Sequence, residues 1–169
     1  GHLEKSTGSF VGKRLALAAG GVGPGIFQLL RELAEEREKL GDGRIRQELA
    51  RLHTELELMR MNSQRTRQKN QQTGGEGNLA KLLMTSALHR TRELAGSILG
   101  PDMALWGDES VTGGMIQEMA VFSPAPSIYG GTDEVQRNII GERVLGLPKE
   151  PGPDKDTSFA ELSQNKTDW

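Results

Sequence analysis

The chain of 169 residues is long enough for one domain with a buried core. Its 21 basic and 23 acidic residues give a net charge of −2, which argues against binding to nucleic acid or to an anionic membrane surface. The lack of cysteine excludes a disulfide scaffold, thiol catalysis and a thiolate zinc site. No apolar run approaches the ~20 residues of a membrane span, so we expect a cytoplasmic protein without a transmembrane segment.

Residues 1–10 are expected to be a frayed lead-in, and Gly1-His2 resembles the remnant of an expression tag. From residue 11 to about residue 40, apolar residues recur with helical spacing and predict a long, deeply buried helix. Pro24 lies in its middle, flanked by glycines, and should kink or split the helix because proline removes a helical hydrogen bond. The glycines would let a flat ligand approach, but we favour close packing against another helix.

A second helix is predicted from about Arg44 to residue 70. Its apolar stripe has i, i+3, i+7 and i+10 spacing and consists of Leu49, Leu52, Leu56 and Met59, with Ile45 one turn earlier. Basic residues gather near its end, where acidic residues precede them and no aromatic residues interleave. We therefore interpret them as a solvated face rather than a polyanion site; they are Arg60, Arg65, Arg67 and Lys69.

A third helix is predicted from an N-cap at Asn78 to a turn at Gly100-Pro101. His53 and His89 lie on separate helices, and neither has the i, i+4 partner of a metal site, so no metal is expected. A short helix is predicted over residues 113–121. The segment that follows it, 123–126, has the sequence Ser-Pro-Ala-Pro and is expected to be extended, because a residue before proline is disfavoured in the α region.

The stretch 127–143 predicts a sharp loop that leads into a helix. Gly130 and Gly131 permit a positive φ, and Thr132 is a favoured N-cap. Asp133 and Glu134 then occupy the first turn, where the helix dipole favours negative charge. The expected buried face of this helix comprises Val135, Ile139, Ile140 and Val144, with Gly146 and Pro148 as the stop. Residues 149–169 are expected to form a flexible tail.

Signals for β-strands are nearly absent from the chain. Three to four long amphipathic helices with short breaks predict an all-α fold, an up-and-down four-helix bundle over residues 11–148.

The order of residues in the stretch 127–143 is also similar to a known signature. Tyr129-Gly130-Gly131-Thr132, then Gln136-Arg137-Asn138-Ile139-Ile140 and Glu142-Arg143, closely resembles the C-terminal signature of the acyl-CoA dehydrogenase flavoprotein family. Residues 13–23, 36–41 and 96–101 resemble the first bundle helix and two cofactor-binding turns of the same family. The resemblance covers about residues 11–148, which is the C-terminal helical domain of the family, and is strongest to actinobacterial members. We therefore expect the chain to be a domain or a truncated piece of a longer polypeptide.

The resemblance implies an enzyme that dehydrogenates acyl-CoA thioesters between the α and β carbons. In the family a glutamate takes the α-proton, FAD accepts a hydride, and electrons pass to an electron-transfer flavoprotein. The substrate-binding residues implied here are Arg14, Tyr129, Gly130 and Gly131. The implied FAD-binding residues are Arg37, Gln47, Gly100, Thr132 and Glu134, of which Arg37 would reach the cofactor of a neighbouring subunit. The family also implies a homo- or hetero-oligomer built through this bundle, and the domain alone should bind FAD weakly or not at all.

This chain lacks a glutamate at both positions from which the family supplies its base. Those positions hold Gly130 and Lys13, and Glu4 could serve only if the lead-in aligned differently. The cofactor turns depart as well, since Leu40, Ser97 and Pro101 replace an aromatic residue, a glutamine and a glycine. The catalytic base is therefore unknown, and one hypothesis is a dehydrogenase that takes its base from a partner subunit. The alternatives are a non-catalytic subunit of a mixed assembly and a helical interaction module unrelated to flavin.

Overall fold

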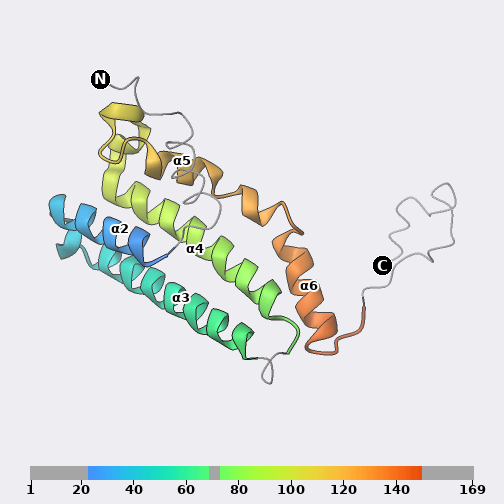
Figure 1. The fold of residues 1–169 in the computed structure, drawn as a ribbon. Helices are drawn as coiled ribbons and strands as arrows, with labels where there is room; N and C mark the ends of the chain where they lie inside the picture. Colours follow the sequence, from blue (N-terminus) through green and yellow to red (C-terminus); the bar gives the residue numbers. More distant parts are fainter. Residues whose placement is uncertain (1–22, 69–72, 150–169) are drawn as a thin grey trace, which may run out of the picture.

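The computed structural model describes residues 23–68 and 73–149, and no β-strand occurs in them (Figure 1). The α-helices are α2 (Pro24–Glu36), α3 (Gly43–Arg67), α4 (Glu76–Leu99), α5 (Met115–Phe122) and α6 (Asp133–Arg143). Short 3-10 helices lie between them, namely η1 (Lys39–Gly41), η3 (Gly100–Ala104), η4 (Gly107–Glu109) and η5 (Ala125–Ser127). The predicted all-α fold is confirmed.

The central helix is α4, which packs against α2, α3, α5 and α6. Figure 1 shows α2, α3 and α4 side by side with alternating direction, which is the predicted up-and-down arrangement. In the same view, α5 lies at the C-terminal end of α4 and α6 lies beside its N-terminal half. Segments that are far apart in the sequence therefore meet at different points along one helix.

Apolar side chains of α2, α3 and α4 form most of the core. The predicted stripe on α3 is confirmed, because Ile45, Leu49, Leu52 and Leu56 are buried and Met59 packs against the core. Polar contacts also join α3 to α4. Arg90 of α4 lies 2.6 Å from a carboxylate oxygen of Glu48 and 3.0 Å from one of Glu55, both on α3.

Pro24 is the first residue of α2, which ends at Glu36. Proline at this position costs no hydrogen bond, because the first N–H groups of a helix have no helical acceptor. The prediction that Pro24 kinks or splits a longer helix is not tested, because the segment before residue 23 lies outside the described residues. The segment 11–22, the lead-in and nearly all of the predicted tail lie outside the described residues.

The predicted N-cap of the third helix is wrong, because α4 begins at Glu76 rather than after Asn78. The Glu76 carboxylate accepts hydrogen bonds from Thr73 N at 2.6 Å, from Thr73 Oγ1 at 2.8 Å and from Gly74 N at 3.0 Å. These contacts hold the turn before α4 and let the helix start three residues earlier than predicted. Asn78 instead lies inside α4, where its side chain contacts α6.

The expectation of an extended segment at 123–126 is also wrong. Ser123 has φ −52° and ψ −30°, and Pro124 has φ −74° and ψ −26°, so both are in the right-handed helical region. Ser123 is fully buried, and its N–H continues the helical pattern of α5 by donating to Met119 O at 2.8 Å. His89 Nε2 lies 3.1 Å from Ser123 O. These contacts outweigh the local preference that a following proline imposes.

The buried face of α6 differs from the predicted one. Val135 is 45% exposed, and Ile139, Ile140 and Val144 are only partly buried, whereas the buried residue of α6 is Gln136 at 7% exposure. Apolar periodicity failed here because polar contacts to α4 set the rotation of α6. The predicted cap is confirmed, since Thr132 Oγ1 accepts a hydrogen bond from Val135 N.

Candidate functional site

The candidate substrate loop, residues 129–132, lies directly before α6. Tyr129 is 51% exposed, and its ring packs at a tilt against Phe122 with the ring centroids 6.4 Å apart. Gly130 and Gly131 both have positive φ, 66° and 84°, a backbone conformation that residues with a Cβ seldom adopt. The predicted need for glycine is thus observed at both positions. The loop presents tyrosine and backbone groups at the surface.

The candidate residues within the described part of the chain fall into two groups. Tyr129, Gly130, Gly131, Thr132 and Glu134 form the loop group at the start of α6, where Lys81 of α4 donates a hydrogen bond to Gly131 O. Arg37 and Gly100 form the turn group at the other end of α4, where Lys39 Nζ donates to Ser97 O at 2.8 Å. The two contact points are about 24 Å apart along α4, given a rise of 1.5 Å per residue. A single small ligand does not bridge them within one chain.

An ion pair holds Arg37 of the turn group in place. Arg37 follows α2, and its guanidinium lies 2.6 Å from a carboxylate oxygen of Asp102 in η3. Gly100 ends α4 with φ 59°, and no heavy atom within 4 Å would meet a Cβ there. Gln47 is exposed on α3. The turn group therefore has two parts. One is Arg37, which is already paired with Asp102, and the other is the turn at Gly100, which has free space beside its backbone.

The loop group carries acidic rather than basic charge at the N-terminus of α6. Hydrogen bonds from its own backbone N–H and from the Thr132 hydroxyl lower the pKa of Glu134, which lies on the exposed surface. Asp133 is 3.2 Å from Thr85 Oγ1 and 3.6 Å from Lys81 Nζ. The two carboxylates thus stabilise the start of α6.

The hollows that α4 lines include a polar one and a mostly apolar one. The polar one, of about 280 Å³, lies between α4 and α6 and is lined by Leu82, Thr85, Ser86, His89, Arg90, Glu93, Asp133 and Arg137. The mostly apolar one, of about 430 Å³, lies between α3 and α4 and is lined by residues that include Met59, Asn62, Thr66, Ala80 and Met84. Each carboxylate that lines them already has a hydrogen-bond or ion-pair partner.

Neither loop nor hollow supplies an obvious catalytic base. Gly130 has no acid group, and the other base position, Lys13, lies outside the described residues together with Arg14 and Glu4. No group of three or more metal-ligating side chains occurs in the described segments, and His89 is packed against Ser123 and Ser127 as a structural histidine.

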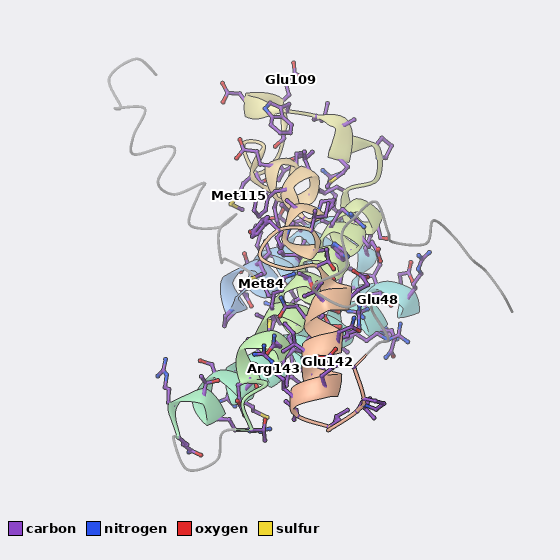
Figure 2. All side chains as sticks on the ribbon, turned by 90° about the vertical axis from the view of Figure 1, so that its right-hand side faces the viewer. Glu48, Met84, Glu109, Met115, Glu142 and Arg143 are labelled. Atoms are coloured by element: carbon purple, nitrogen blue, oxygen red, sulfur yellow. The ribbon has the colours of Figure 1, made fainter. Side chains whose placement is uncertain are left out.

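The structure also identifies residues at the loop that sequence reasoning missed. Lys81, Asn78 and Gln136 contact the loop or one another across the α4–α6 interface. Figure 2 shows α6 lying in front of the bundle, with Glu142 and Arg143 at its C-terminal end. A signal for Gln136 was present, because Gln136-Arg137 is part of the signature quoted for the stretch 127–143.

Comparison with known proteins agrees with this arrangement. The family model for the acyl-CoA dehydrogenase C-terminal domain matches residues 4–145. The chain is 38% identical over 121 residues to acyl-CoA dehydrogenase IpdE1 of Mycobacterium tuberculosis, and 39% identical over 119 residues to IpdE1 of Mycolicibacterium smegmatis. Each match covers 70% of this chain, but only 31% and 29% of the respective relative. The chain thus spans less than a third of the length of these relatives.

Two solved structures have a similar fold. The ChsE4–ChsE5 complex from Mycobacterium tuberculosis matches with a TM-score of 0.64 and 26% identity, over 75% of this chain and 36% of that chain. The Tcur3481–Tcur3483 steroid ACAD matches with a TM-score of 0.66 and 24% identity, over 82% of this chain and 38% of that chain.

The fold and the loop define the helical C-terminal domain of an acyl-CoA dehydrogenase. This chain belongs to the acyl-CoA dehydrogenase family, as the match of its C-terminal domain model over residues 4–145 shows. In the described segments, no helix has both the length and the apolar character required to cross a bilayer.

Proposed function

We propose that this chain is the C-terminal helical domain of a flavin-dependent dehydrogenase that acts on acyl-CoA thioesters as part of a mixed-subunit assembly. The observation that carries the proposal is the loop 129–132. It has the tyrosine and the tight glycine turn of a substrate loop, yet Gly130 stands where many family members carry the catalytic glutamate. Dehydrogenation needs a carboxylate that can take the α-proton, so a partner subunit would have to supply it.

The two groups of candidate residues support an assembly of subunits. Because the loop group and the turn group lie at opposite ends of α4, each would contact a different FAD, one of its own subunit and one of a neighbour. Arg37 would hold a phosphate of the neighbour's FAD, and Gly100 would let the cofactor approach the backbone. Bound FAD would supply the acceptor for the hydride from the β carbon. The ChsE4–ChsE5 structure, a complex of two different proteins, supports the same kind of assembly here.

The residues of the turn group fit FAD only in part. Arg37 is available at the surface, but Asp102 neutralises it, and Ser97 and Pro101 replace side chains that the family uses. We therefore expect the chain alone to bind FAD weakly. Electrons would leave the complete enzyme through an electron-transfer flavoprotein.

The test is an assay of the complete polypeptide, loaded with FAD, alone and after co-expression with a candidate partner subunit. The substrates are straight-chain and bulky polycyclic acyl-CoA thioesters, and the readout is reduction of an artificial electron acceptor. We expect turnover by the mixed assembly and little turnover by the polypeptide alone. Robust turnover by the complete polypeptide alone would show that this polypeptide supplies its own base and would refute the need for a partner.

A second candidate function is a non-catalytic subunit that contributes only bundle surface. The ion pair of Arg37 with Asp102 favours it, because an arginine that is already neutralised is poorly suited to bind a phosphate. Under this alternative, the mixed assembly would contain one FAD for each partner subunit and none for this polypeptide. Measuring the flavin content of the purified assembly distinguishes this non-catalytic subunit from the flavin-dependent dehydrogenase proposed above.

A further inference from the structure

The glycine pair of the substrate loop is held by a buried side chain of α6. Gln136 is 7% exposed, and its Nε2 donates hydrogen bonds to Gly130 O at 3.0 Å and to Gly131 O at 3.3 Å. The other end of the same amide, Oε1, accepts a hydrogen bond of 2.6 Å from Asn78 Nδ2 of α4. Because Asn78 takes the oxygen end, the amide directs its donor end at the two carbonyl groups.

A second side chain reaches the loop from α4. The side chain of Lys81 is 14% exposed, donates to Gly131 O and lies 3.6 Å from Asp133 Oδ1. Asp133 is in turn 3.2 Å from the hydroxyl of Thr85. The positive charge of Lys81 is thus placed between a carbonyl oxygen of the loop and a carboxylate of the first turn of α6.

The position of the Gln136 amide leaves no room for a side chain at Gly131. A Cβ at this position would lie 2.7 Å from Gln136 Nε2, which is too close for any side chain unless the amide moves. At Gly130, by contrast, no heavy atom lies within 4 Å of the same ideal position. Gly131 and Gln136 therefore act together, because the absence of a side chain at one makes room for the amide of the other.

Other contacts hold the two ends of this loop, where Tyr129 N donates to Ala125 O at 3.0 Å and Thr132 caps α6, but they do not reach the carbonyl groups of the glycine pair. The flanking apolar side chains of the loop are exposed, Ile128 by 69% and Tyr129 by 51%, so burial contributes little there. Two adjacent glycines have wide conformational freedom and would otherwise sample many backbone states.

We infer that Lys81 and Gln136 are positioning residues that clamp the backbone of the loop 129–132 through the carbonyl groups of Gly130 and Gly131. The inference rests on the proposed function in assigning this loop to the acyl thioester. The clamp sets where Tyr129 and the loop backbone stand relative to the substrate. Since a displacement of about 1 Å can cost ~10²-fold in rate, such a clamp would act mainly on kcat.

Four variants test the clamp. Gln136→Glu keeps the size of the side chain but replaces the donor nitrogen with oxygen, and Lys81→Met removes the charge and the donor. Lys81→Arg keeps both and should rescue. Gln64→Leu, on the exposed surface of α3, is the matched control.

The first readout is the backbone ¹⁵N order parameter of Gly130, Gly131 and Thr132 in the 169-residue chain. We expect it to fall from about 0.85 to below about 0.6 in Gln136→Glu and Lys81→Met, and to stay high in Lys81→Arg and Gln64→Leu. Loop order parameters that stay unchanged in both Gln136→Glu and Lys81→Met, with helical circular dichroism retained, would overturn the clamp.

The second readout is steady-state kinetics of the assembled enzyme with FAD and its partner subunit. We expect kcat to fall by roughly 10- to 100-fold in Gln136→Glu and Lys81→Met, with a much smaller change in KM. Lys81→Arg should retain most of the kcat of the unmodified assembly. A loosened loop with unchanged kcat would show that the clamp has no part in positioning the substrate. If the unmodified assembly oxidises no acyl-CoA, the proposed function fails, while the order parameters still decide whether the clamp exists.

Discussion

Arg37 and Asp102 form an ion pair in which Nη2 and Oδ2 are 2.6 Å apart, linking the end of α2 to the turn after α4. The two side chains are 32% and 37% exposed, so the pair lies at the surface. The arginine that the family resemblance assigns to a neighbouring subunit's FAD therefore has an acid partner within its own chain. To bind an external phosphate, Arg37 would have to share or leave Asp102.

Asp102→Asn should free Arg37 at little cost in stability. Surface ion pairs contribute about 0–1 kcal/mol, so we expect the free energy of unfolding to change by less than ~1 kcal/mol and FAD affinity of the assembled enzyme to rise by up to about fivefold. Thermal denaturation and calorimetric titration with FAD measure the two effects. Asp108→Asn, an exposed acid in η4, is the control. Weaker FAD binding in Asp102→Asn alone would mean that Asp102 presents Arg37 to the cofactor and does not compete with it.

Gly130→Ala and Gly131→Ala form a matched pair. Both place a Cβ at positive φ, which costs roughly 1–2 kcal/mol. Only Gly131→Ala also displaces the Gln136 amide, since the new Cβ would be 2.7 Å from Nε2. We expect it to cost about 1–3 kcal/mol more than Gly130→Ala, because buried hydrogen-bonding groups lose partners. Urea unfolding gives both values, and equal costs would contradict this account.

Gly130→Glu should restore a base to the loop of the complete polypeptide. The ideal Cβ position at Gly130 is free of neighbours, so the new side chain meets no obstacle at its root. A general base typically contributes ~10²- to 10⁴-fold in rate, and we expect a gain of this order in the polypeptide assayed without a partner. Gly130→Gln has the same shape but cannot accept the proton, and it serves as the control. Equal rates for the two variants would show that the loop position does not face the α carbon.

Acid stability should depend on Glu76. The backbone N–H and the hydroxyl of Thr73, with the N–H of Gly74, lower the pKa of Glu76 to about 2. A carboxyl group in the unfolded chain has a pKa near 4.3, so this stabilisation is complete above about pH 4.3 and is lost as the pH falls toward 2.

The measurement for Glu76 is the melting temperature between pH 5 and pH 2. We expect Glu76→Gln to have a lower Tm at pH 5 and a smaller further decrease on acidification, because its side chain cannot be protonated. Glu109→Gln, an exposed carboxylate in η4 labelled in Figure 2, is the control and should follow the unmodified chain. Parallel curves for Glu76→Gln and the unmodified chain would refute the role of Glu76.

Local sequence patterns, namely apolar periodicity and helix-capping residues, predicted much of the fold. The stripe on α3 and the N-cap at Thr132 follow from helical periodicity and from the hydrogen bonds that helix ends lack. The family signature also indicated the loop 129–132 as the candidate site.

Only the tertiary structure determined how these elements face one another. The helical conformation of Ser123 and the burial of Gln136 departed from local preference because side chains of α4 contact them. The earlier start of α4 instead follows from hydrogen bonds of Glu76 to the nearby Thr73 and Gly74. The contact of Lys81 with Gly131 spans 50 positions of sequence, and that of Asn78 with Gln136 spans 58. Such contacts depend on the register and rotation of α6 against α4. Apolar periodicity could not provide either, because the interface is fixed by an amide, an ammonium group and a glycine that has no side chain.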